Sequence, residues 1–93
     1  MTVTEVIKEL GLNNSDFQTS DDKIYVYQIP DSDSFSRLFN LLDSDEKFEE
    51  DLDSQDINLF TNTVVFIDGD GEVECTLFAD FTKDTYTLTL VVM

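Results

Sequence analysis

The sequence predicts an α+β fold: an antiparallel sheet of three to four strands with two or three short helices packed on one face. Three observations lead to this prediction. Apolar residues recur at helical spacing in parts of the first half of the chain, they alternate along the second half, and turn residues separate these segments. The chain has 93 residues, 41% of them hydrophobic, with no linker-like stretch. We therefore expect a single domain over 1–93 with one core.

The N-terminal segment is expected to form a short helix over about 3–10. Residues 2–5 have the form of a capping box, and Gly11 stands where a glycine ends a helix. Between these signals, apolar residues recur at helical spacing: Val3, Val6, Ile7 and Leu10. The polar segment 13–22 follows, and we expect a loop anchored by Phe17.

A strand is expected over 23–29, because β-branched and aromatic residues dominate there and Pro30 ends the run. Next, residues 31–34 offer several helix N-caps. One apolar helical face follows, made by Phe35, Leu38, Phe39 and Leu42. The stripe breaks at residues 43–46 and resumes at Phe48 and Leu52, so we expect two short helices, or one kinked helix, over roughly 33–53.

The remainder is expected to be an antiparallel meander. Strands over 62–67, 72–81 and 85–92 are separated by a glycine turn at 68–71 and a polar turn at 82–84. Alternation along the last two strands predicts one buried face and one face rich in Thr and Glu. Cys75 falls on the buried face, which indicates a core residue and not a nucleophile. Strand 87–92 could be an exposed edge that invites pairing between copies.

The charge balance excludes several classes of partner. The chain carries 21 acidic and 5 basic residues, for a net charge of −16, and has no His. Direct binding of nucleic acid or of an anionic membrane surface needs a basic patch, which the sequence lacks. No segment has the composition of a membrane span or a signal peptide. With a single Cys, we expect a cytoplasmic, reducing environment.

No motif predicts catalysis, a metal or a cofactor. The segment Asp68-Gly69-Asp70-Gly71-Glu72 resembles a calcium loop only in part. If Gly71 took position 6 of such a loop, Phe66 and Leu77 would occupy positions 1 and 12, where calcium needs oxygen ligands. A hairpin turn with solvated carboxylates is the expected structure. Carboxylates are numerous, but none is singled out by an apolar pocket, so we do not expect an enzyme.

The strongest feature is an acidic belt between Asp31 and Asp56, offset only by Arg37 and Lys47. If 43–53 were helical, Asp43, Glu46, Glu50 and Asp53 would form a row of charges about one turn apart, like a line of phosphates. Ordinary charge runs are solvated faces. Here the self-repulsion favours a binding role. The ten belt residues, our candidate partner-binding set, are Asp31, Asp33, Asp43, Asp45, Glu46, Glu49, Glu50, Asp51, Asp53 and Asp56.

In size, charge and the acidic segment 43–56, the chain resembles small acidic phage proteins that inhibit host nucleic-acid enzymes. These include anti-CRISPR proteins, anti-restriction DNA mimics and uracil-DNA glycosylase inhibitors. The resemblance is one of composition, with no aligned motif. A preference for residues with AT-rich codons fits a low-GC bacterium or its phage.

This resemblance implies a stoichiometric inhibitor that occupies the nucleic-acid site of a host enzyme such as a CRISPR effector nuclease. The belt would be its main contact, and Asp68, Asp70 and Glu72 a second acidic point. Two alternatives stay open. One is an immunity or regulatory protein that binds a basic partner without mimicking nucleic acid. The other is a small homo-oligomeric structural protein, such as a homodimer.

Overall fold

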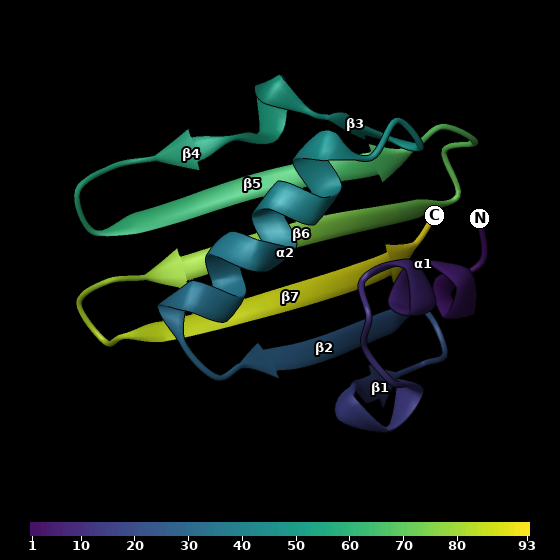
Figure 1. Ribbon diagram of the computed structural model, residues 1–93, viewed down its shortest axis with the longest axis horizontal. Coiled ribbons are helices and arrows are strands. Elements are labelled where there is room, and N and C mark those ends of the chain that lie inside the picture. Colours follow the sequence, from purple (N-terminus) through teal and green to yellow (C-terminus); the bar gives the residue numbers. More distant parts are fainter.

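The computed structural model describes residues 1–93 and contains one antiparallel sheet (Figure 1). The strand order is β1-β2-β7-β6-β5-β3, and β4 also pairs with β5. Both α-helices lie on the same face of the sheet (Figure 1). In chain order the elements are α1 (Val3–Glu9), the 3-10 turn η1 (Asn14–Asp16), β1 (Gln18–Ser20), β2 (Ile24–Ile29), α2 (Ser32–Ser44), β3 (Phe48–Glu50), the 3-10 turn η2 (Leu52–Ser54), β4 (Asp56–Ile57), β5 (Thr61–Asp68), β6 (Val73–Asp80) and β7 (Thr85–Val92).

The predicted sheet of three to four strands with two or three short helices is therefore wrong, because the sheet has seven strands and two α-helices cover it. The four longer strands, β2, β5, β6 and β7, occupy the segments where strands were expected. The extra strands β1, β3 and β4 have only two or three residues each. Such short strands carry no alternation, and pairing with β2 and β5 creates them.

The helical structure expected to continue to residue 53, as a second short helix or as part of one kinked helix, is also wrong. The helix α2 ends at Ser44, and Asp45 has extended backbone angles (φ −87°, ψ 118°). Phe48 then enters the core as a strand residue opposite Asp68, with 7% of its surface exposed. A helix here would place uncompensated carboxylates at i,i+4 spacing, which repel each other. Burial of Phe48 and pairing with β5 therefore stabilise the strand conformation of this segment over a helix.

The C-terminal strand is not an edge. β7 lies between β2 and β6 and pairs with both over its length, from Ile24↔Val91 on one side to Asp80↔Thr85 on the other. A homo-oligomer formed by pairing of this strand between copies is therefore no longer supported. The two edges of the sheet are β1 on one side and β3 with β4 on the other.

The core lies between the two helices and the face of the sheet that they cover. α1 contributes Val6 and Ile7, and α2 contributes Leu38 and Leu42. Alternate residues of β6 and β7 meet them, while the residues between are half-buried on the other face, as predicted. The fully buried side chains of these two strands are Val73, Cys75, Leu77, Ala79, Leu88 and Leu90.

The ends of α1 follow the sequence signals. The hydroxyl of Thr2 accepts a hydrogen bond from the backbone N–H of Glu5 (3.2 Å). At the other end Gly11 adopts φ +71°, a left-handed conformation that favours glycine. Its N–H donates to the carbonyl of Lys8 (3.0 Å), and that of Leu12 donates to Ile7 (3.1 Å), which together make a Schellman ending.

Candidate functional site: an acidic sheet edge

The structure divides the acidic belt into two groups. Asp31 and Asp33 stand at the start of α2, and the other eight residues begin at Asp43 in its last turn. The 13 residues of α2 hold these groups about 20 Å apart. The belt is therefore not one continuous surface, and its larger part follows β3, η2 and β4 along the sheet edge (Figure 1).

The predicted helical row of carboxylates is absent. Of its four members, Asp43 is in the last turn of α2, Glu46 lies in the following turn, Glu50 is on β3 and Asp53 is in η2. The physical reason is the end of α2 at Ser44, after which the chain runs along β5. The charges are arranged along a sheet edge and not along a helix face.

The average spacing of the charges along this acidic edge follows from its pairing with β5. Glu49 pairs with Ile67 of β5, and Asp56 pairs with Thr63 of the same strand. Four residue steps of an antiparallel strand cover about 14 Å, so the edge carries about one carboxylate for every 3 Å of its length. We define the acidic edge as Glu49, Glu50, Asp51, Asp53 and Asp56.

Four belt carboxylates stabilise local structure. That of Asp31 caps α2 by accepting from the N–H of Ser34 (2.8 Å), and this bond lowers the pKa of Asp31. Those of Asp45, Glu50 and Asp51 accept hydrogen bonds from Lys47 N–H, Gln55 Nε2 and Ser54 Oγ. The other six are exposed and accept no protein hydrogen bond: Asp33, Asp43, Glu46, Glu49, Asp53 and Asp56.

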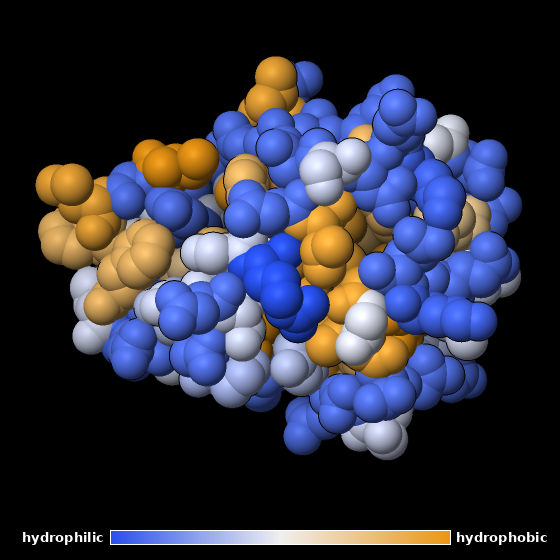
Figure 2. Space-filling view, viewed as in Figure 1, coloured by the Kyte–Doolittle hydropathy of each residue, from blue (hydrophilic) through white to orange (hydrophobic).

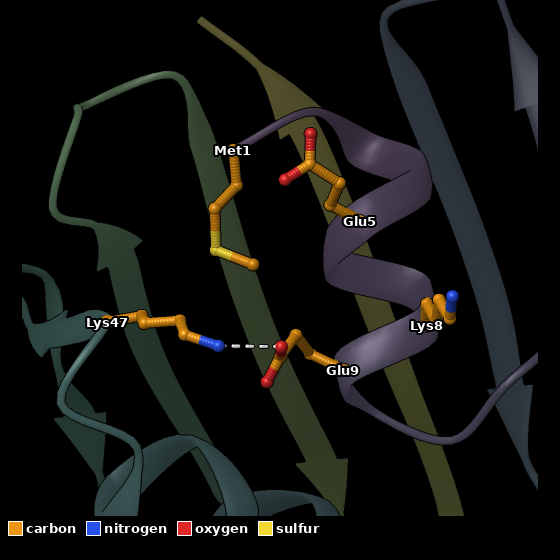
Figure 3. A pocket seen from close by; sticks show the side chains of 5 residues that line it. All are labelled: Met1, Glu5, Lys8, Glu9 and Lys47. Carbon is orange, nitrogen blue, oxygen red and sulfur yellow. Dashed lines mark hydrogen bonds and ion pairs between the residues drawn. The ribbon is translucent and has the colours of Figure 1, made fainter.

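The two basic residues within the belt, Arg37 and Lys47, do not neutralise the acidic edge. The ammonium of Lys47 lies 2.7 Å from Glu9 Oε1 on α1, and Figure 3 shows the two side chains meeting across a hollow. This ion pair raises the pKa of Lys47. Arg37 forms no ion pair and lines a shallow depression on α2 with Asp33 and Asn40. The edge carboxylates therefore face solvent without a cation of their own.

The second acidic point lies beside the edge. The N–H of Gly69 donates to the carbonyl of Lys47 (2.8 Å), which holds the β5–β6 turn against the start of β3. An open hollow of about 500 Å³ lies between them, lined on one side by Glu49, Glu50 and Asp51 and on the other by residues 67–71. No group of acidic side chains in the protein is arranged to hold a metal ion.

The carboxylates of this turn are occupied by the N-terminus. The Met1 ammonium lies 3.0 Å from Asp68, 3.2 Å from Asp70 and 3.5 Å from Glu72. Its hydrogen bond to Asp68 is the main cause that raises its pKa to about 10. Asp68 is 3% exposed. Burial opposes ionisation of Asp68, but the hydrogen bond from the N–H of Glu72 and the Met1 ammonium lower its pKa on balance.

Sequence reasoning missed an apolar surface next to the acidic edge. Figure 2 shows apolar residues gathered at the left, over the β4–β5 and β6–β7 turns. We call these residues the apolar tip: Ile57, Leu59, Phe60 and Phe81. Phe81 ends the predicted strand 72–81 and shares the alternation of Cys75, which predicts that it points inward, but it is 46% exposed. The available signal was the pair of large apolar residues at 59–60, directly before a strand.

The single cysteine is a core residue, as predicted. Cys75 is fully buried on the helix-covered face of β6. Burial, with a smaller contribution from the charge of Asp68, raises the pKa of its thiol to about 12. A thiol in this environment stays protonated and does not act as a nucleophile.

Comparison of the chain with protein-family models, with curated proteins and with solved structures finds no match. No helix of the structure is long and apolar enough to cross a membrane.

Proposed function

We propose that this protein is a stoichiometric inhibitor that mimics the charge of nucleic acid and occludes the nucleic-acid-binding site of a host enzyme, such as a CRISPR effector nuclease. The observation that carries the proposal is the charge density of the acidic edge. One strand of B-DNA carries a phosphate about every 3.4 Å along its axis. The edge carries five carboxylates over about 14 Å of β5, an average of one for about every 3 Å.

The arrangement of the edge supports this role beyond solubility. Charged residues on short edge strands also prevent pairing with other sheets, and that role alone is fulfilled by one or two charges. Here five carboxylates lie together, and the nearest base, Lys47, is paired with α1. A basic groove that tracks a phosphate backbone would complement such a line and be steered toward it.

The partner in this proposal is a basic, nucleic-acid-binding protein in the cytoplasm of the host bacterial cell. The inhibitor would act by occupying the groove, with no chemistry of its own and no cofactor. Occlusion predicts mutual exclusion between inhibitor and nucleic acid on the partner. This exclusion separates the proposal from its alternative, an immunity or regulatory protein that binds a basic partner elsewhere. The apolar tip favours that alternative, since it offers a contact that phosphates do not provide.

The test is affinity capture from a low-GC bacterial lysate, with elution by duplex DNA or single-stranded RNA at constant ionic strength. We expect a nucleic-acid-binding protein to be retained and to be released by one of these competitors. The double variant E49Q/D53N should no longer retain this nucleic-acid-binding protein. The matched control is D21N/D22N, which has the same net charge but changes the turn between β1 and β2 at the opposite edge. Equal retention by both variants, or a partner indifferent to nucleic acid, would contradict mimicry.

A further inference from the structure

The turn between β4 and β5 holds two large apolar side chains out in solvent. Asn58 Oδ1 accepts hydrogen bonds from the N–H groups of Phe60 (2.8 Å) and Thr61 (2.9 Å). The N–H of Asn58 donates to the carbonyl of Thr61 (3.0 Å). These bonds fix the backbone, yet Leu59 is 90% and Phe60 62% exposed. Apolar side chains that an ordered backbone presents to solvent are typical of binding contacts, because the cost of ordering that backbone is met before binding.

The neighbouring β6–β7 turn completes the apolar tip. The N–H of Phe81 donates to the carbonyl of Phe60 (2.9 Å), so the two turns are joined. The ring of Phe81 contacts Tyr86 edge-on, with ring centres 6.4 Å apart. Tyr86 in turn contacts Phe35 of α2 at 5.6 Å. A continuous line of aromatic rings therefore links the exposed tip to the helix.

A cavity of about 340 Å³ lies between α2 and this end of the sheet. Asn62 also lines it, and the side-chain oxygen Oδ1 of this residue is buried without a hydrogen-bond partner. A buried acceptor without a donor destabilises a protein. Solvent does not reach this oxygen, so a ligand that brings an N–H or O–H group would bond to it after the Asn62 side chain turns toward the cavity. The apolar walls of the cavity are formed by Phe35, Phe39, Ile57 and Val64.

The charges around the tip indicate the kind of partner. Three carboxylates accompany a single basic residue, Lys83, in the segments that form the tip: Asp56, Asp80 and Asp84. A second copy of this chain would bring the same acidic surroundings and a net charge of −16 to the contact. Like charges placed together at an interface are unfavourable, whereas a basic surface is complementary.

We propose that the apolar tip and its cavity form a second docking site, which receives an apolar side chain from a basic protein partner. The side chain enters the cavity, Asn62 turns so that its Oδ1 accepts a hydrogen bond from an N–H or O–H of the partner, and lysines or arginines face the surrounding carboxylates. This inference rests on the proposed function for the positive charge of the partner. The docking site adds an apolar contact whose strength does not depend on the screening of charges by salt. The neighbouring acidic edge attracts the partner electrostatically, and salt screens that attraction.

The test uses two blocked heptapeptides with equal charge, each having two lysines at either end. The centre is Leu-Trp-Leu in one and Ser-Gly-Ser in the other. The protein contains no Trp, so tryptophan fluorescence reports only the Leu-Trp-Leu peptide, and titration followed by amide shifts of the protein measures both peptides. We expect the apolar peptide to bind at least about tenfold more tightly, with blue-shifted emission and with amide shifts at residues 57–62 and 81. This preference should persist at about 1 M salt.

The variant L59S/F60S should abolish the preference while leaving the weak binding of the Ser-Gly-Ser peptide unchanged. The control is L52S, which changes an apolar residue of η2 that is also exposed but does not belong to the apolar tip. Equal affinity for both peptides, or shifts confined to other surfaces, would overturn the proposal. Sedimentation that reveals a dimer dependent on Leu59 would instead assign the tip to a second copy.

The outcome is independent of the test of mimicry. If a captured partner is indifferent to nucleic acid but is lost from L59S/F60S, the proposed function fails and the docking site stands. If the partner is displaced by DNA and is retained equally by L59S/F60S and L52S, the docking site fails and the proposed function stands.

Discussion

The ammonium of Met1 lies 3.0 Å from Asp68 Oδ2, across 67 positions of sequence. Asp68 ends β5 on the helix-covered side of the sheet and is almost fully buried. A carboxylate is stable there only with partners, and it has two: the Met1 ammonium and the N–H of Glu72. The contact fastens the start of the chain to the β5–β6 turn beside the acidic edge.

We predict that D68A destabilises the protein by about 2 kcal/mol, because the N–H of Glu72 loses its acceptor in a partly buried position. D68N keeps an acceptor and should be milder. Urea unfolding followed by circular dichroism measures both. D70N is the control, since Asp70 is exposed and also contacts the ammonium. An effect of D70N as large as that of D68A would contradict the role assigned to the buried carboxylate.

Stability should fall as the pH rises from about 8 to about 10. The pKa of the Met1 ammonium is raised from 8.0 to about 10 by its bond to Asp68. A raised folded-state pKa means that the contribution is complete below pH 8 and is lost as the pH passes through 10. Cys75 adds a loss in the same direction above pH 9, because burial keeps its thiol protonated in the folded state. Denaturant unfolding at several pH values measures the slope.

Acetylation of the N-terminus isolates the ammonium. The acetylated protein should be less stable at pH 7 and should keep only the part of the slope that belongs to Cys75. If acetylated and free proteins lose stability in parallel between pH 8 and 10, the ion pair contributes nothing in solution.

The sequence allowed the regular elements to be predicted where one residue pattern repeats. Thr2 and Gly11 mark the ends of α1, and alternation along β6 and β7 identifies their buried face. The short strands were missed because long-range pairing creates them. Phe48 shows why: helical spacing with Leu52 favours a helix, but contact with the core and with β5 decides for a strand.

The candidate site was predictable in composition but not in shape. The ten acidic residues are evident from the sequence, yet their split into two groups depends on where α2 ends. The nearness of Asp70 to Glu50 arises from the pairing of β3 with β5, which no local pattern indicates. The apolar tip has no periodic signal, because Leu59 and Phe60 are adjacent residues of a turn held by Asn58.

We predict that F48A lowers the free energy of unfolding by about 3 kcal/mol and loosens the acidic edge. Phe48 is the only residue of β3 that enters the core, so its loss removes the apolar anchor of that strand. Hydrogen exchange should rise first at the N–H of Asp51, which donates to Val65 in β5 (2.8 Å). L52A is the control, because Leu52 is exposed, and its stability should match the unmodified protein.

We predict that N62V raises the free energy of unfolding by about 1 kcal/mol while weakening the Leu-Trp-Leu peptide. The substitution removes a buried oxygen that has no donor, and valine suits a strand. Thermal unfolding and peptide titration measure the two effects. T63V, at the neighbouring position of β5, is the control and should leave peptide affinity unchanged. A stability loss in N62V would show that the amide has a partner in solution.

The acidic edge and the apolar tip should contribute independently to binding. E49Q/D53N should weaken both heptapeptides equally, by a factor of about two to thirty, and flatten their salt dependence, because each exposed charge contributes up to about 1 kcal/mol and is screened. L59S/F60S should weaken only the Leu-Trp-Leu peptide, with unchanged salt dependence. Combining the four substitutions should add the two free-energy changes to within about 0.5 kcal/mol, because the groups have no shared contacts. Fluorescence titration of the four proteins measures this cycle, and a larger coupling would mean that edge and tip form one site.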